Sequence, residues 1–316
     1  MPPSEEKDYR PKLKAAILPS AGIGDAVIFL QAAEVLKKGG YEVSIYHSSI
    51  KSLSPYLPSF TILKKDLLLT EKLFSYDLVF AQYDDSKETK DHLSIKNKHP
   101  RFHIFYPSYK KEKHGPLGPL DFASDPKLSL IKNLTSAMHG ILTSKEKSSP
   151  LLDTKHLSHR KKIKQVIIHP FSNSKQKTWP LKKYLLLAKT LKKKGYSPLF
   201  IMKPEETNLF VTKEFPIRSS PNLSDLASLI HQSGFFIGND SGPGHLASLL
   251  QIPSIIIADD YKRMKLWKPD YYPVKLITPA PWIPNLKWMR LRKRYWASYI
   301  PVSKVVREFN SISIEN

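Results

Sequence analysis

The sequence predicts an α/β protein of two Rossmann-like domains whose parallel sheets face an inter-domain cleft. Short apolar segments alternate with segments of helical spacing, the pattern of parallel sheets. The alternation runs through the chain twice, and a polar, strongly basic stretch at 144–164 between the two series is expected to be the linker. Glycine-containing turns follow several apolar segments, at the strand ends where open α/β sheets bind their ligands.

The first series is expected to form an N-terminal domain at 1–158. It begins with a buried strand at 14–19, a tight turn at 21–24 and a helix at 25–38 that ends at Gly39-Gly40, where helices commonly end on glycine. Its remaining segments are predicted to be strands at 42–46, 76–81 and 102–106, an exposed loop at 110–125 and a helix at 126–142.

The second series is expected to form a C-terminal domain at 159–316. Its segments are predicted to be strands at 165–169, 199–202, 235–238 and 254–258 and helices at 181–194, 205–212, 223–231 and 242–250. A last helix at about 303–312 is a candidate to pack back on the N-terminal domain.

Composition narrows the classes of function. The 316 residues contain no cysteine, which excludes disulfides, zinc–thiolate sites and thiol nucleophiles. The 50 Lys and Arg against 28 Asp and Glu give a formal net charge of +22, which favours phosphorylated substrates, nucleic acid or an anionic membrane surface as partners. The alternative is that most of these lysines only solvate ordinary helix faces. The polar N-terminus has no apolar signal segment, so a cytoplasmic protein is expected.

A basic and aromatic segment at 282–299 stands out near the C-terminus. Trp282, Trp288 and Trp296 alternate there with lysines and arginines. This mixture suits a membrane interface or a nucleic-acid strand. The alternative is a packed segment whose arginines are solvated.

The most informative motif is the turn at 238–244 between a predicted strand and a predicted helix. Asp240, Ser241 and Gly242 lie in the turn, and His245 follows it. Backbone N–H groups and the helix dipole would converge there on a phosphate or another anion. The alternative is a buried turn in which Asp240 caps the helix.

A second motif, Gly22-Ile23-Gly24-Asp25, follows the first strand. It lacks the third glycine of the dinucleotide fingerprint. A carboxylate at this place could accept a proton from a substrate hydroxyl. The alternative is that Asp25 only caps its helix.

Two further motifs follow strands of the second series. The loop at 169–180 carries the hydroxyls of Ser172 and Ser174 and the ammonium of Lys177, groups suited to a diphosphate; the alternative is a solvated loop with Trp179 packed. In the segment after 199–202, Glu205 and Glu206 are positioned to hold nucleoside hydroxyls. Acids are also favoured in the first turn of any helix, so the alternative is that Glu205 and Glu206 only stabilise a helix start.

The order of these motifs resembles glycosyltransferase family 9, the ADP-heptose:lipopolysaccharide heptosyltransferases, over about residues 14–260. The shared elements are Gly24-Asp25, the Lys-x-Trp-Pro of 177–180 and the Asp-Ser-Gly-x-x-His-Leu of 240–246. The resemblance implies a GT-B fold and an inverting transferase that uses a nucleotide-diphosphate sugar, most simply ADP-heptose. The chain has no Asp-x-Asp motif, so neither a metal nor a cofactor is expected.

The resemblance also implies roles for particular residues. Asp25 matches the general base, on an acceptor-side turn with Gly22 and Gly24. Lys177 matches the lysine on the donor phosphates. On the donor side it implies Asp240 as the residue that holds the sugar, Ser241, Gly242 and His245 as the phosphate-contacting turn, and Glu206 or Glu205 as a nucleoside contact. The loop hydroxyls of Ser172 and Ser174 complete the expected donor side.

The resemblance implies partners as well. They are a phosphorylated glycolipid acceptor and the inner face of the cytoplasmic membrane, with no nucleic acid. Other donors, a protein acceptor or an inactive relative remain open. Phe171 stands where the family has glycine, and its bulky ring is expected to narrow or reshape the donor loop.

Overall fold

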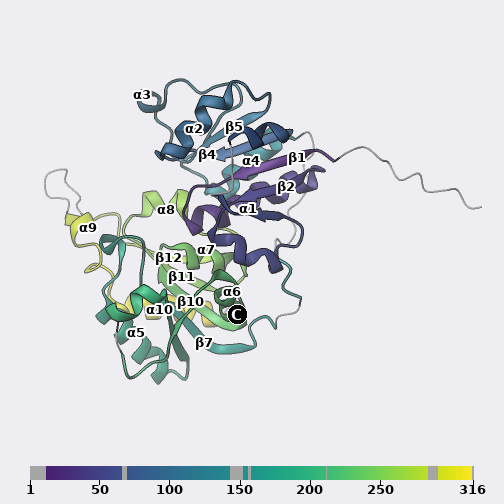
Figure 1. Ribbon diagram of the computed structural model, residues 1–316. Helices are drawn as coiled ribbons and strands as arrows, with labels where there is room; N and C mark the ends of the chain where they lie inside the picture. Colours follow the sequence, from purple (N-terminus) through teal and green to yellow (C-terminus); the bar gives the residue numbers. More distant parts are fainter. Residues whose placement is uncertain are drawn as a thin grey trace, which may run out of the picture.

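The computed structural model describes residues 12–65, 70–142, 152–155, 158–210, 212–283 and 291–314. Two halves lie against each other, each around its own sheet (Figure 1). The first half holds β1 (Lys14–Leu18), α1 (Ile23–Lys38), β2 (Glu42–Tyr46), η1 (Ser49–Tyr56), β3 (Thr61–Leu63), η3 (Thr70–Ser75), β4 (Leu78–Gln82), α2 (Lys87–Lys96), β5 (Phe102–Tyr106), α3 (Lys111–His114), β6 (Phe122–Ala123) and α4 (Leu130–Ile141).

The second half follows the same alternation of strands and helices. It holds β7 (Lys162–His169), η4 (Lys175–Lys177), α5 (Leu181–Lys193), β8 (Ser197–Met202), η5 (Pro204–Leu209), β9 (Ile217–Ser219), α6 (Leu223–Gln232), β10 (Ser233–Asn239), α7 (Gly242–Leu249), β11 (Ser254–Ile257), α8 (Tyr261–Trp267), β12 (Val274–Ile277), α9 (Leu291–Arg294) and α10 (Val302–Ile314).

Both sheets are six-stranded and parallel, with the orders β3-β2-β1-β4-β5-β6 and β12-β11-β10-β7-β8-β9. If the strands of each half are counted from its own start, both orders read 3-2-1-4-5-6, the doubly wound Rossmann order. The order reverses between β1 and β4 in the first half and between β7 and β10 in the second. Ligands bind at such switch points, beyond the carboxyl ends of the strands.

A continuous apolar core joins the two halves. Phe29 of α1 belongs to the same buried cluster as Leu246 of α7, and Leu53 of η1 belongs to it with Leu226 of α6. Polar contacts cross the same boundary: the Tyr271 hydroxyl donates to the carbonyl of Val27 at 2.9 Å. Burial of this apolar surface holds the carboxyl ends of the two sheets against each other.

The predicted α/β class and the two parallel sheets are confirmed, and several local predictions are corrected. Strand β7 begins at Lys162, inside the expected linker, of which 144–151 and 156–157 lie outside the described residues. The expected loop at 110–125 contains α3 and β6. The helix at 126–142 begins only at Leu130, because the Ser129 side chain accepts the N–H of Lys132 and caps it there.

The last helix does not pack as expected. α10 lies on α5 and the second sheet, where Phe309 packs its ring 4.8 Å from Tyr196 and 5.0 Å from Phe235. Its apolar stripe of Val305, Phe309 and Ile312 is buried there, so this stripe faces the second half and not the first. The domain boundary at 158/159 stays a prediction. Within the described residues, no helix has both the length and the apolar character to cross a membrane.

Candidate active site

The turn that leads into α1 touches the turn that leads into α7. A side-chain carbon added to Gly24 would lie 3.1 Å from Cδ2 of His245, and one added to Gly242 would lie 2.9 Å from Cβ of Ile23. The contact at Gly242 is closer than real side-chain carbons come, so a larger residue there would displace Ile23, whereas at Gly24 the His245 ring would have to move by a few tenths of an ångström. The predicted acid-bearing turn and the predicted anion-binding turn therefore face each other.

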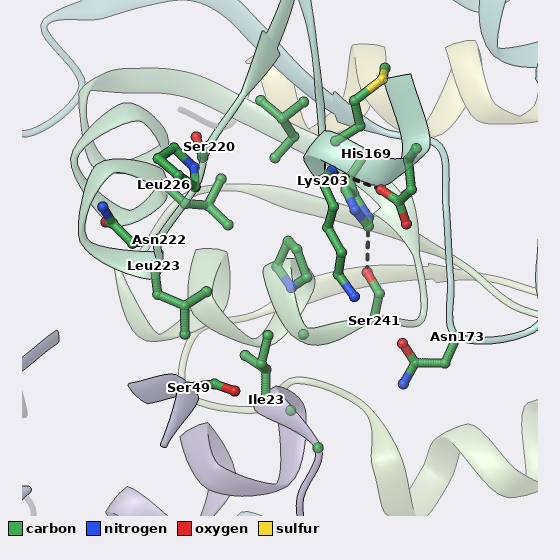
Figure 2. A pocket seen from close by; sticks show the side chains of 18 of the residues that line it. Ile23, Ser49, His169, Asn173, Lys203, Ser220, Asn222, Leu223, Leu226 and Ser241 are labelled. Atoms are coloured by element: carbon green, nitrogen blue, oxygen red, sulfur yellow. Dashed lines mark hydrogen bonds between the residues drawn. The ribbon is translucent and has the colours of Figure 1, made fainter. Parts of the chain in front are cut away.

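A pocket of about 630 Å³ opens beside this contact and takes its walls from both halves (Figure 2). The first half contributes the Ala21–Gly24 turn and serines of the β2–η1 connection. The second half contributes the ends of β7, β8 and β9, the start of α6 and the α7 turn. Its lining residues are Ala21, Gly22, Ile23, Gly24, Ser48, Ser49, Ser52, His169, Ser172, Asn173, Ile201, Met202, Lys203, Pro204, Glu205, Glu206, Ser220, Pro221, Asn222, Leu223, Leu226, Ser241, Gly242 and Pro243.

Asp25 lies in the first turn of α1 without capping it, since the cap position is Gly22. The Gln82 side-chain N–H donates to Asp25 Oδ1 at 2.5 Å, and Gln82 Oε1 accepts the N–H of Ser20 at 3.1 Å. Burial raises the pKa of Asp25 against the lowering effect of the Gln82 hydrogen bond, and the charges of Asp84 and Asp240 raise it further. A carboxylate with a raised pKa holds a proton more readily, which suits a general base.

Asp240 is paired with an arginine that the sequence analysis did not single out. Arg263 of α8 donates to Asp240 Oδ2 at 2.6 Å and to Asp259 Oδ1 at 2.9 Å. Ser241, not Asp240, holds the cap position of α7. Asp240 is therefore fixed in place by a charge-assisted pair instead of serving as the helix cap.

The α7 turn is tied to the loop after β7 by buried polar groups. Asn239, fully buried, accepts the N–H of Trp179 at 3.0 Å and donates to the carbonyl of Pro170 at 2.8 Å. The Ser241 hydroxyl lies 3.2 Å from Nδ1 of His169, whose pKa is lowered to about 4 by burial and by the charge of Lys203. Both rings beside the turn are neutral near pH 7, since burial also lowers the pKa of His245.

Several polar groups of the loop after β7 hydrogen-bond with one another. The Ser172 hydroxyl donates to the carbonyl of Ser174 at 2.8 Å and lies 3.1 Å from the Thr178 hydroxyl. Trp179 is buried, and its indole N–H donates to the carbonyl of Ile300 at 3.1 Å. Phe171 packs against the second half's apolar core and does not line the pocket, so its ring does not narrow the pocket, and its effect on the shape of the donor loop stays a prediction.

In the segment after β8, one of the two acids caps the start of η5, as the alternative to a nucleoside contact predicted. The Glu206 carboxylate accepts the N–H of Lys203 at 2.8 Å, while Glu205 is exposed. Both acids line the pocket, and so does Lys203.

The pocket thus brings together only part of the predicted set. Gly22, Gly24, Ser172, Glu205, Glu206, Ser241 and Gly242 line it, whereas Asp25, Ser174, Lys177, Asp240 and His245 do not. Four further residues hold or line the site: Gln82, Asn239, Lys203 and Arg263. The first two could have been found as amide residues at the carboxyl end of a strand. Within the described residues, no group of three or more Asp, Glu or His side chains could hold a metal ion.

In the basic and aromatic segment at 282–299, one tryptophan is buried and another is exposed. Trp296 is buried, and its indole N–H donates to the carbonyl of Gln176 at 2.8 Å. Trp282 is 82% exposed. Trp288 lies outside the described residues. The packed alternative therefore holds for Trp296, and Trp282 remains available to a surface.

Comparison with known proteins confirms the resemblance. The sequence model of glycosyltransferase family 9 (heptosyltransferase) matches residues 132–277, a narrower range than the expected 14–260 and one that begins after Asp25. No curated protein sequence matches the chain.

Solved structures share the fold over nearly the whole chain. A family 9 glycosyl transferase of Veillonella parvula DSM 2008 is 14% identical, with a TM-score of 0.73 over 96% of this chain and 98% of that one. E. coli ADP-heptose lps heptosyltransferase II is 15% identical, with a TM-score of 0.68 over 96% and 99%. E. coli heptosyltransferase WaaC with ADP-2-deoxy-2-fluoro heptose is 11% identical, with a TM-score of 0.68 over 95% and 99%. At these identities the likeness establishes the GT-B fold.

Proposed function

We propose that this chain, whose residues 132–277 match the model of glycosyltransferase family 9, is a member of that family and an inverting transferase that moves heptose from ADP-heptose to a hydroxyl of a lipopolysaccharide core acceptor. The observation that carries the proposal is the contact between the acid-bearing turn at Gly24 and the α7 turn at Gly242. It brings a proton acceptor and an anion-binding helix start to one cleft. The heptosyltransferase structures that share the fold support the choice of sugar.

The pocket supports a nucleoside-diphosphate donor. Its volume of about 630 Å³ lies in the usual range for small-molecule sites. Met202, Pro204, Pro221, Leu223 and Leu226 give one region apolar walls for a base. At the other end, the N–H groups at the start of α7 are suited to the diphosphate.

The reaction would proceed across the cleft. The acceptor oxygen attacks the anomeric carbon, the bond from that carbon to the diphosphate oxygen breaks, and the acceptor proton passes to Asp25. Negative charge then grows on the leaving diphosphate, where the α7 N–H groups and Lys177 would stabilise it. No metal takes part in this scheme.

Asp240 would hold the donor sugar. Arg263 occupies its Oδ2, and within the described part of the chain Oδ1 has no hydrogen-bond partner. That oxygen is free to accept a sugar hydroxyl. Because the charge of Asp240 acts on Asp25, a sugar placed between them would lie beside the base.

The acceptor would be reached at a membrane. The net charge of +22 and the exposed Trp282 support peripheral association with the inner face of the cytoplasmic membrane. Vesicles that contain acidic lipids should bind the protein more strongly than neutral vesicles. Equal binding to both would remove this part of the proposal.

Calorimetry with ADP, UDP and GDP tests the donor. The proposal predicts that ADP binds most tightly and that ADP-heptose competes with it. Tighter binding of UDP or GDP would point to another donor, and steeply salt-dependent nucleic-acid binding with no nucleotide binding would favour an inactive relative.

A further inference from the structure

Lys203 has a fixed backbone and a free side chain. It stands between β8 and η5, where its N–H donates to the Glu206 carboxylate at 2.8 Å and its carbonyl accepts the N–H of Glu206 at 3.0 Å. Within the described residues, its ammonium has neither a hydrogen bond nor an ion pair. The side chain is exposed, yet it lines the pocket.

The ammonium points toward the start of α7. Figure 2 shows the Lys203 side chain extended into the pocket, with its nitrogen toward Ser241. The charge of Lys203 acts on His169, and His169 lies within hydrogen-bond distance of the Ser241 hydroxyl, 3.2 Å away. The cation, the hydroxyl and the helix start therefore converge on one part of the pocket.

Within the described residues, the ammonium without a partner stands beside a helix start, although Glu205 and Glu206 also line the pocket. The nearby Glu206 carboxylate is engaged with the backbone N–H of Lys203, not with its ammonium. Lys177, the cation that the resemblance assigns to the phosphates, does not line the pocket. The apolar walls at Leu223 and Leu226 lie in the same cavity, so a bound nucleoside would extend its phosphates toward Lys203.

We infer that Lys203 binds the donor's diphosphate from the nucleoside side of the pocket, opposite the N–H groups of α7. The inference rests on the proposed nucleotide-sugar function and adds a residue to it. Lys203 would make affinity depend on the phosphates of the ligand while leaving the fit of the base unchanged.

Calorimetric titration of ADP and adenosine tests the inference. Lys203→Met keeps the length of the side chain and removes its charge. A hydrogen bond to a charged group of this kind corresponds to about a 10- to 100-fold loss of ADP affinity. Adenosine should bind the variant as it binds the wild type, and Lys203→Arg should retain most of the ADP affinity.

A matched control is Lys213→Met, which removes one exposed charge after η5 at a residue outside the pocket lining. It should bind ADP as the wild type does. An independent readout is the imidazole signal of His169, whose pKa should rise in Lys203→Met because the ammonium that lowers it is gone.

Three results would overturn the inference. Unchanged ADP affinity in Lys203→Met would show that the ammonium does not reach the phosphates. Equal losses for ADP and adenosine would make Lys203 part of the nucleoside wall. If the wild type itself bound neither ligand, the proposed function would fail and this inference with it.

Discussion

The two halves of the molecule share one strand order but carry different groups at their switch points. In the first half, the turn after the first strand carries Asp25, and the nearby Asp84 adds a second carboxylate. In the second half, the corresponding region carries neutral His169, the cation Lys203 and the open N-terminus of α7. The Rossmann order decides where a ligand can lie, and the residues at the switch point decide what charge it must have.

An amide side chain at the end of the fourth strand ties the switch point together in each half. Gln82 ends β4 and joins Asp25 to the backbone of Ser20. Asn239 ends β10 and joins the backbones of Trp179 and Pro170. The amide of the first half therefore holds the reactive carboxylate, while that of the second half holds only the loop framework.

The largest expected effect comes from a substitution of Asp25, which removes the proton acceptor of the first half. Asp25→Asn keeps the shape of the side chain and removes its ability to take a proton, so the transfer rate should fall about 10²- to 10⁴-fold. Because burial raises the pKa of Asp25, its ionised form destabilises the folded state above that pKa. The variant should therefore melt at a higher temperature than the wild type at pH 7, in a calorimetric scan. A lower melting temperature would contradict this burial argument.

Asn239→Ala should damage the second half as a structure. It removes two buried hydrogen bonds and leaves the N–H of Trp179 and the carbonyl of Pro170 without these partners. We expect a loss of about 2–4 kcal/mol in the free energy of unfolding, measured by urea denaturation. Asn222→Ala, which removes the helix cap of α6, is a comparison outside the switch point and should cost only about 1 kcal/mol. Equal losses of unfolding free energy in the two variants would show that Asn239 stabilises the fold no more than a helix cap does.

Acid should weaken both halves, because each contains a histidine that folding keeps neutral. Burial lowers the pKa of His103 and of His169 to about 4, from an ordinary value of 6.5. Their contribution to stability is complete above pH 6.5 and is lost as the pH falls toward 4. In this window each should reduce the free energy of unfolding by about 1.4 kcal/mol per pH unit, measured by urea denaturation in the Asp25→Asn background. Stability that stays constant from pH 7 to pH 4 would contradict the burial of these rings.

The smallest expected effect tests whether Gln82 and Asn239 have different roles. Gln82→Leu removes a hydrogen bond that favours the ionised form of Asp25, so the pKa of Asp25 should rise further. The acidic limb of kcat/KM should therefore move to higher pH. A limb that does not move, combined with a large loss of stability, would make Gln82 a framework residue like Asn239.

The regular strand and helix pattern made most of the fold predictable. The apolar runs that became β1, β5, β8 and β11 are continuous and bounded by clear turns. The short strands β3, β6 and β9 have only two or three residues, too few for a pattern to register. Helix α2 was missed because its sequence is polar almost throughout and it is held by a Ser86 cap and by contacts of its side chains.

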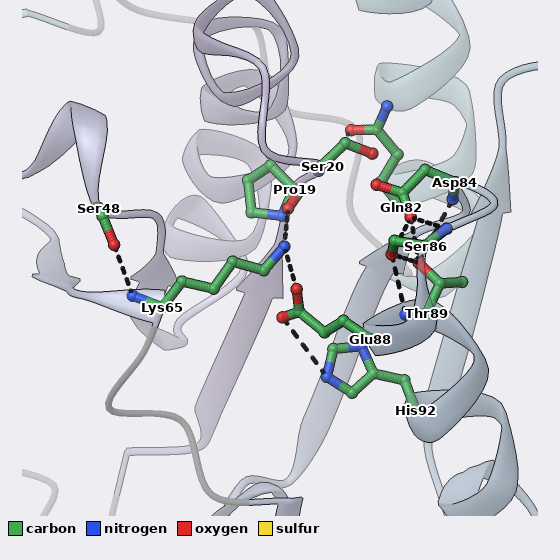
Figure 3. A network of polar contacts seen from close by, with 10 residues as sticks. All are labelled: Pro19, Ser20, Ser48, Lys65, Gln82, Asp84, Ser86, Glu88, Thr89 and His92. Carbon is green, nitrogen blue, oxygen red and sulfur yellow. Dashed lines mark hydrogen bonds and ion pairs between the residues drawn. The ribbon is translucent and has the colours of Figure 1, made fainter.

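Within the site, motif residues could be found but their partners could not. Arg263 reaches Asp240 from 23 residues further along the chain, on a helix that the pattern did not predict. A network of similar kind links Lys65 to Glu88 and to the carbonyl of Pro19 beside the acid-bearing turn (Figure 3). Such pairs form only where segments distant in the chain come together in the fold. The local sequence pattern does not predict these contacts.

Mass spectrometry of the transfer reaction tests the central claim most directly. The protein would be incubated with ADP-heptose and truncated lipopolysaccharide cores, beside Asp25→Asn. The account predicts that the wild type adds one heptose to a core, whereas the variant does so about 10²- to 10⁴-fold more slowly and still binds ADP with wild-type affinity. Transfer by Asp25→Asn at the wild-type rate would contradict a proton acceptor at position 25.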